Sequence, residues 1–369
     1  MKALRFIKKN LVFCIAASAA IVTCFFVPPD REYLGYFDLN TLSCLFLTLA
    51  VICALRNIKF FTILARKLVT FAGNMRSLFL LLITITFIGS MIIANDMALI
   101  TFLPLGFFAL SVVKQEKYMA YLFVLQNISA NLGGMLTPFG NPQNLYLYSY
   151  FNIPTDEFCL IMLPAFLLAI TMLGIACLFV RPVKFTIDDD YGEKLNIKKT
   201  ILYCILFLAS ILIVFRVIPF ALGLAVIPVI LFITDRESLL MVDYALLGTF
   251  FFFFIFAGNL SRIDAVHNLI SSLLEKDTLI VSVLSCQFIS NVPSAILLSR
   301  FTGDYAALLL GVNIGGTGTL IASLASLITF SEFKLLHPEQ TKKYLLLFTV
   351  INVIFLLIMT AAAKLFFIS

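Results

Sequence analysis

Long apolar runs separated by short polar segments form the main pattern of this chain of 369 residues. Three runs, residues 11–27, 201–215 and 344–363, approach or exceed the roughly 18 residues that a bilayer-spanning helix needs. The pattern predicts an all-α polytopic membrane protein. We expect about nine full crossings, near residues 11–27, 38–55, 118–150, 157–180, 200–218, 220–234, 244–260, 305–330 and 344–367.

Two further apolar stretches, residues 76–110 and 278–301, have polar residues or proline at their middle. A single helix over 76–110 would be roughly 50 Å long, well beyond a hydrocarbon core of about 30 Å. Basic residues adjoin both of its ends, so both ends favour the cytoplasm. We therefore predict a re-entrant hairpin that turns at Asn95 and Asp96, and a second hairpin over 278–301.

Composition supports lipid as the solvent of this fold. Apolar residues make up 62% of the chain and charged residues 12%, whereas soluble domains have about 45–50% and about 25%. The formal net charge is +6, but the basic residues lie in short clusters beside apolar runs without a recognised nucleic-acid motif. We expect no nucleic-acid partner. The eight cysteines lack the paired spacings of a zinc site or redox couple.

The basic residues predict the orientation of the chain. With both middle-polar stretches folded as hairpins and a cytoplasmic amino terminus, 20 of the 26 Lys and Arg residues lie on the cytoplasmic side. A multi-pass protein of the bacterial inner (plasma) membrane is the location that we expect.

The same arrangement predicts an inverted repeat. Residues 1–180 hold two crossings, an amphipathic segment, the hairpin 76–110, the broken helix 118–150 and one further crossing. Residues 181–218 form a cytoplasmic loop and a linking helix. Residues 219–369 repeat the order in opposite orientation, with the hairpin 278–301 and the broken helix 305–330, because an odd number of crossings separates the halves.

Two pairs of segments match between the halves without a gap. MIIANDMALITFLPL (91–105) aligns with QFISNVPSAILLSRF (287–301), and NLGGMLTPFGNPQN (131–144) aligns with NIGGTGTLIASLAS (313–326). Glycine, proline, asparagine and threonine at membrane depth favour unwound backbone, which persists there only when it is buried in protein or lines a wet cavity. The second pair of segments therefore indicates a binding site.

Asp96 is the only carboxylate that we place at mid-depth inside a transmembrane element. An unpaired charge there costs several kcal/mol, which a proton or cation would relieve. Two simpler roles stay open: Asp96 as the N-cap of the second half-helix, and Asn95 and Asn291 as helix-to-helix hydrogen-bonding residues. No phosphate-binding loop, metalloprotease motif or nucleophile elbow occurs in the sequence, so we expect a protein that is not an enzyme.

At ANDMAL, ANLGGMLTPFGNPQN, ISNVPSAI and VNIGGTGTLIASLAS, the sequence resembles the ion transporter superfamily. The resemblance is to its arsenite-permease/NhaD-type, citrate-transporter-like (anion permease) branch and covers nearly the whole chain. It implies an elevator-like movement of the hairpins and broken helices, and a homodimer. It places the substrate and ion site at Asn95, Asp96, Asn141, Gln143, Asn144, Ser290, Asn291, Thr317 and Thr319.

A sodium ion near Asn95, Asp96 and Asn291 is also implied, with Na⁺ or H⁺ as the coupling ion and no other cofactor. Carboxylate-transporting relatives have a Ser-Asn-Thr type hairpin motif, whereas Asp96 and Val292 follow the tip asparagines here. The substrate therefore stays open between a small anion, an arsenite-like neutral species and sodium exchanged for protons.

The leading hypothesis is a secondary active transporter of a small anion that is coupled to a proton or sodium gradient. A sodium/proton antiporter or an arsenite-type efflux permease is the alternative within the same class. A passive channel, or the membrane subunit of an ATP-driven pump, is the alternative from another class.

Overall fold

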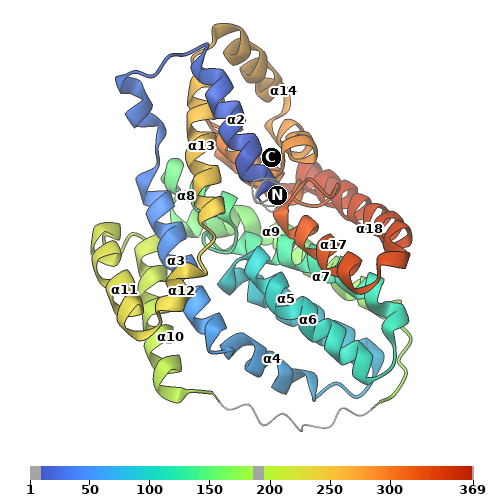
Figure 1. The fold of residues 1–369 in the computed structure, drawn as a ribbon. Helices are drawn as coiled ribbons and strands as arrows, with labels where there is room; N and C mark the ends of the chain where they lie inside the picture. The colour runs from blue at the N-terminus through green and yellow to red at the C-terminus, as the bar shows by residue number, and fades with distance from the viewer. Residues whose placement is uncertain (1–9, 186–194, 368–369) are drawn as a thin grey trace.

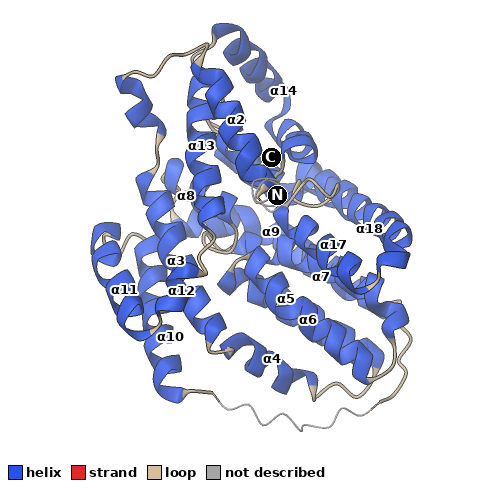
Figure 2. Ribbon diagram, viewed as in Figure 1, coloured by secondary structure: helices blue, strands red, loops and turns tan. Residues whose placement is uncertain are grey.

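The computed structural model describes residues 10–185 and 195–367, and within these ranges every regular element is helical (Figures 1 and 2). The predicted all-α fold is confirmed. Among the described residues, seven helices are long and apolar enough to span a membrane, which agrees with a polytopic membrane protein. These candidate spans are Leu39–Asn57, Met75–Ile93, Asn95–Val112, Thr155–Leu178, Ile197–Val214, Arg236–Ser261 and Pro338–Phe366.

The seven long helices do not correspond one to one with the nine predicted crossings. They include both arms of the first hairpin, and each predicted broken helix consists of shorter helices. The first and sixth predicted crossings are also apolar helices of fewer than 18 residues. Length alone therefore undercounts the apolar elements of this fold.

The first half of the chain is a series of helices, some of which begin at a capping side chain. Asp38 and Asn74 cap two of its helices, accepting hydrogen bonds from the backbone N–H groups of Thr41 (2.9 Å) and Ser77 (3.0 Å). Its elements are α2 (Leu11–Cys24), η1 (Arg31–Tyr36), α3 (Leu39–Asn57), α4 (Phe60–Val69), α5 (Met75–Ile93), α6 (Asn95–Val112), η2 (Glu116–Tyr118), α7 (Met119–Gly133), η3 (Gly134–Leu136), α8 (Pro142–Tyr150) and α9 (Thr155–Leu178).

Helices α5 and α6 form a helical hairpin, with Ala94 as the single residue between them. The ring of Phe102 on α6 lies against Gly89 on α5, where a Cβ atom would collide with it. Gln126 of α7 holds the two arms together, because its Nε2 donates to Thr86 Oγ1 (3.2 Å) and to the Phe102 carbonyl (3.0 Å). The arms therefore pack as a pair against the broken helix.

The second half of the chain starts with α11, after the single linking helix α10, and both helices pack against α3 at the left of Figure 1. The elements from the linking helix onward are α10 (Ile197–Val214), α11 (Phe220–Thr234), α12 (Arg236–Leu240), α13 (Tyr244–Ser261), α14 (Asp264–Ile289), α15 (Asn291–Leu298), α16 (Tyr305–Ile314), α17 (Leu324–Leu336), η4 (Pro338–Gln340), α18 (Thr341–Ala362) and η5 (Ala363–Phe367).

The second hairpin starts inside α14. That helix is interrupted at Asp277, whose φ of −168° and ψ of 91° are not helical. The interruption separates residues 264–276 of α14 from the hairpin arm, which begins one residue later, at Thr278. The arm pairs with α15 through a hydrogen bond of 2.9 Å between the hydroxyls of Ser285 and Ser294.

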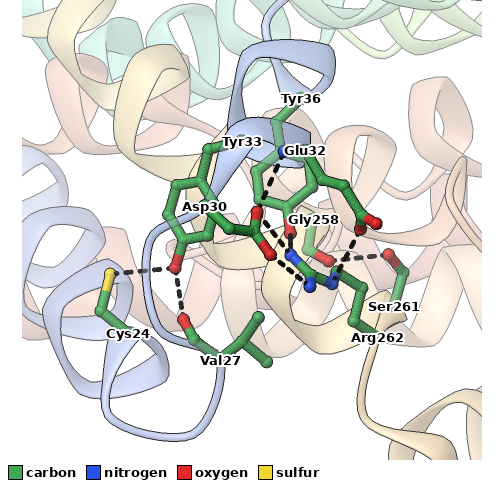
Figure 3. A network of polar contacts seen from close by, with 9 residues as sticks. All are labelled: Cys24, Val27, Asp30, Glu32, Tyr33, Tyr36, Gly258, Ser261 and Arg262. Atoms are coloured by element: carbon green, nitrogen blue, oxygen red, sulfur yellow. Dashed lines mark hydrogen bonds and ion pairs between the residues drawn. The ribbon is translucent and has the colours of Figure 1, made fainter.

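Helices α2 and α13 lie side by side in Figure 1, and α13 packs against α15 of the second hairpin. A polar network at their ends fixes the intervening loop (Figure 3). Arg262 binds Asp30 (2.6 Å) and Glu32 (3.1 Å) and donates to Tyr36 Oη (3.0 Å). The guanidinium of Arg262 holds the pKa of Asp30 below its usual value. Arg262 thus acts as an ion-pair partner of this loop.

Candidate functional site

The two hairpin tips have the same unusual backbone conformation. Ala94 has φ 65° and ψ 151°, and Ser290 has φ 77° and ψ 158°. Both lie in a region that is almost restricted to glycine. Each turns the chain sharply, so that Asn95 and Asn291 become the first residues of α6 and α15. The two residues were aligned in the sequence comparison of the halves.

Each tip is bonded to the unwound segment of its own half. The Asn95 backbone N–H donates to the Gly140 carbonyl (3.2 Å), and the Asn291 backbone N–H donates to the Ala322 carbonyl (2.9 Å). Gly140 and Ala322 are equivalent positions of the aligned segments. The same hydrogen bond therefore joins hairpin and broken helix in both halves.

The side chains of the two tip asparagines make one equivalent hydrogen bond. Asn95 Oδ1 accepts from the Asp96 backbone N–H and Asn291 Oδ1 from the Val292 backbone N–H, both at 2.9 Å. Asn95 also donates from Nδ2 to Asn131 Oδ1 (3.3 Å). These bonds order the first turn of each short helix. The tip side chains are buried, with 3% of each exposed.

A cavity of ≈ 120 Å³ lies where the two tips meet. Its lining comes from both hairpins, from the start of α8 and α17, and from the start of α2 and α13. The residues that line it are Asn10, Val12, Phe13, Asn95, Asp96, Pro142, Gln143, Asp243, Ala245, Leu246, Thr249, Ser290, Asn291, Val292, Pro293 and Leu324.

The helix amino ends around this cavity include those of α6, α8, α15 and α17, which begin at Asn95, Pro142, Asn291 and Leu324. Each such end carries roughly half a positive charge, because its first N–H groups have no partner within the helix. Among the described lining residues, the ionisable side chains are Asp96 and Asp243. The cavity thus combines helix ends that favour anions with carboxylates that favour cations.

The two broken helices contact each other through Asn313 of α16. Its Oδ1 accepts from Asn141 Nδ2 (3.2 Å) and Gln143 Nε2 (3.4 Å), and its Nδ2 donates to Asn144 Oδ1 (2.6 Å). Asn144 Nδ2 in turn faces the carbonyls of the first break, Gly134 (3.2 Å) among them. Buried amide groups therefore supply the partners that the broken helix lacks.

The structure brings five of the nine predicted site residues to the cavity wall: Asn95, Asp96, Gln143, Ser290 and Asn291. Asn141 and Asn144 lie just behind it, in the amide network around Asn313. Thr317 and Thr319 do not line the cavity. Thr317 donates to the Ile314 carbonyl (2.7 Å), and Thr319 binds the Gln287 backbone and side chain on the hairpin arm.

Two residues that sequence reasoning missed are part of this region. Asn313 was visible as the partner of Asn131 in the aligned segments. Asp243 lines the cavity from the start of α13, whereas we expected a crossing that begins at residue 244. The candidate membrane span extends from Arg236 to Ser261 and therefore includes Asp243. This span was the sequence signal that could have placed Asp243 inside a transmembrane element. In the described ranges, no group of three or more His, Cys, Asp or Glu residues could hold a metal.

A family profile matches most of this chain. The profile of the citrate transporter family matches residues 3–307. The chain belongs to this family. It is 32% identical to an uncharacterized transporter of Methanocaldococcus jannaschii over 343 residues, which are 91% of this chain and 92% of the relative.

Two further relatives are named for their location or cargo. The inner membrane protein YbiR of Escherichia coli is 26% identical over 333 residues, 88% of each chain. A silicon efflux transporter of Oryza sativa subsp. japonica is 31% identical over 164 residues, 44% of this chain and 33% of the relative. The protein is thus an integral, multi-pass membrane transporter of the citrate transporter family.

Proposed function

We propose that this family member is a secondary active transporter that moves a small anion together with a proton or a sodium ion. The observation that carries the proposal is the cavity between the hairpin tips, where the amino ends of the hairpin helices α6 and α15 and of α8 and α17 meet the carboxylate of Asp96. Half-helix ends of this kind bind anionic substrates in other transporters. The cavity volume of ≈ 120 Å³ favours a small solute, since pockets for drug-sized ligands have about 300–1,000 Å³.

Asp96 supports coupling to a cation. One of its carboxylate oxygens, Oδ1, is buried and has no hydrogen-bond partner. An anion that enters a cavity with this carboxylate is repelled unless a proton or metal cation neutralises the charge. Cation and anion therefore bind more favourably together than separately, which is the thermodynamic condition for symport.

The contacts of the hairpins support an elevator-like movement. Gln126 and Gln287 bind each hairpin to its own broken helix, and Asn313 binds the two broken helices to each other. These polar bonds join the four elements into one unit. By contrast, α10 and α11 pack on α3 outside that unit. We propose that the unit carries the bound solute past the outer helices, in a homodimer of the bacterial inner membrane with a cytoplasmic amino terminus.

The test is uptake into proteoliposomes that contain the purified protein. A sodium gradient, a proton gradient, both or neither is imposed, and the solutes are citrate, a dicarboxylate, phosphate, arsenite and silicate. Accumulation of an anion above equilibrium that requires one gradient supports the proposal. Equilibration without accumulation under every gradient contradicts it and indicates a channel, while accumulation only with an added ATPase and ATP indicates a pump subunit.

A second candidate is efflux of a small hydroxylated inorganic solute in exchange for a cation. Two observations favour it: the plant relative is named a silicon efflux transporter, and no Lys, Arg or His occurs among the described residues that line the cavity. Silicate or arsenite movement driven by an opposing cation gradient, with no uptake of citrate or phosphate, would select this candidate. Sodium and proton exchange without any solute would select an antiporter.

A further inference from the structure

Asp243 reaches the cavity from a different element than Asp96 does. It is the N-cap of α13, which pairs with α2, whereas Asp96 lies in the first turn of the hairpin helix α6. Both carboxylates line the cavity, together with Gln143 at the start of α8. Two carboxylates on one small cavity repel each other, so their joint position favours a bound cation.

The capping bond of Asp243 accounts for one of its oxygens. Asp243 Oδ1 accepts a hydrogen bond from the backbone N–H of Leu246 (2.9 Å). A neutral asparagine oxygen caps a helix about as well as an aspartate oxygen. Capping alone therefore does not require a negative charge at this position, and the charge is available for a ligand.

Gln143 supplies an independent sign of a ligand. Its side chain is 1% exposed and lines the cavity, and its Oε1 has no hydrogen-bond partner, while its Nε2 donates to Asn313 Oδ1 (3.4 Å). Leaving a buried carbonyl oxygen without a partner costs about 1–3 kcal/mol. A neutral amide oxygen does not take up a proton at ordinary pH, but it coordinates a hard cation well.

We propose that Asp243, Asp96 and the Oε1 atom of Gln143 together hold the coupling ion, and that this ion is Na⁺. This inference rests on the proposed cation-coupled function and names the residue that completes its cation site from outside the hairpins. Oxygen ligands from carboxylates and amides suit hard cations of this kind. Because α13 and the hairpin contribute one carboxylate each, the ion links the two elements while it is bound.

Among the described residues, the helices around the cavity add no further charged side chain to its wall besides Asp96 and Asp243. Helices α2 and α15, which pack against α13, have no charged residue within their bounds. Arg56 of α3 approaches α6 at Met97, with Nη1 3.9 Å from Sδ, but it lines a separate cavity with Arg66 of α4. Arg76 of α5 donates to the carbonyls of Val180 and Leu178.

The experiment measures ²²Na⁺ binding to the purified protein in detergent at fixed pH and without transported solute, with choline keeping the ionic strength constant. The variants are Asp243→Asn, Gln143→Ala and Asp96→Asn. The matched control is Asp304→Asn, because Asp304 likewise caps a helix of the second half, through Ala307 N (3.1 Å), but does not line the cavity. Thermal unfolding without Na⁺ verifies that each variant is folded.

We expect Asp243→Asn to raise the half-saturating Na⁺ concentration by about tenfold or more, as removal of partners around other metal sites does. Asp304→Asn should bind Na⁺ like the wild type, and Asp243→Glu should bind more tightly than Asp243→Asn. If Asp243→Asn binds Na⁺ like the wild type, or if the wild type binds none, the inference is wrong.

A parallel titration of pH at constant Na⁺ separates the two ions. A change in proton dependence without any change in Na⁺ binding would overturn the assignment to sodium. Different outcomes would refute the inference about Asp243 and the proposed transport function. Wild-type liposomes that bind Na⁺ at Asp243 without accumulating any solute contradict the transport proposal, while accumulation that Asp243→Asn leaves equally Na⁺-dependent contradicts only the role of Asp243.

Discussion

Ala94 and Ser290 occupy equivalent positions at the tips of the two hairpins, and both have positive φ angles, 65° and 77°. Each is followed by an asparagine whose backbone N–H binds a carbonyl of the adjacent unwound segment. In both halves, therefore, the same local backbone conformation ends one helix, begins the next and places an asparagine at the cavity wall.

The first prediction concerns strain at this tip. The backbone of Ala94 lies in a region where a side chain costs about 1–3 kcal/mol, and glycine removes that cost at an entropic penalty of about 0.5–1 kcal/mol. We expect Ala94→Gly to raise the free energy of unfolding by about 1 kcal/mol. Ala98→Gly, one turn further in α6, should lower it by about that amount. Thermal unfolding in detergent compares them, and equal destabilisation by both would refute the strain.

The second prediction tests the close approach of hairpin and broken helix. A Cβ atom on Gly133 would collide with the Phe87 carbonyl and with Ser90, whereas one on Gly174 would meet nothing. We expect Gly133→Ala to lower the free energy of unfolding by about 1–3 kcal/mol, while Gly174→Ala leaves it unchanged or raises it by up to about 1 kcal/mol. Equal unfolding temperatures of the two variants would mean that the hairpin does not pack here.

The third prediction concerns Asn144. Its amide donates to the Gly134 and Met135 carbonyls (3.2 and 3.1 Å) and accepts from Asn313. Asn144→Ala removes the donor to both buried carbonyls and one acceptor of the Asn313 amide, so we expect a loss of about 1–3 kcal/mol in stability and a loss of uptake. Asn352→Ala is the control, since Asn352 is equally buried but donates to Phe348 within its own helix. Uptake that survives Asn144→Ala at wild-type rates would contradict the role of the network.

The fourth prediction is that the stability of the protein depends on pH through the ion pair between Asp30 and Arg262. The ion pair keeps the pKa of Asp30 lowered in the folded protein, below the value of 3.8 that we take for the unfolded chain. A lowered folded pKa means that the stabilisation is complete above the unfolded pKa and is lost as pH falls through the folded pKa. The unfolding temperature of the wild type should therefore fall more steeply below pH 4 than that of Asp30→Asn. Parallel curves for the two proteins would exclude the ion pair as the cause.

The hairpin tips and the breaks in the helices could be predicted because a few neighbouring residues in the sequence mark each of them. Asn95 and Asn291 interrupt apolar runs, and Pro138 and Pro142 prevent a continuous helix, so composition alone marks both kinds of element. The weak match between the halves then predicted which positions correspond. The hydrogen bonds from Asn95 and Asn291 to Gly140 and Ala322 join those positions in the structure.

The remaining members of the site depend on contacts between distant segments. Asp243 is the N-cap of an apolar helix, and its sequence neighbours do not reveal that α13 starts beside the hairpin tips. Thr317 and Thr319 follow the glycines of the second motif, yet their side chains bind carbonyl groups beside them. Which residue of an unwound segment faces the cavity is decided by tertiary packing.

The central claim is that Asp96 couples solute movement to a cation. The most direct measurement is gradient-driven uptake into proteoliposomes by the wild type and by Asp96→Asn, with equal amounts of folded protein verified by thermal unfolding. We predict that Asp96→Asn abolishes accumulation above equilibrium and the accompanying Na⁺ or H⁺ flux, because the neutral amide no longer requires a cation. Accumulation and ion flux at wild-type rates in Asp96→Asn would contradict the mechanism and leave Asp96 without a role in coupling.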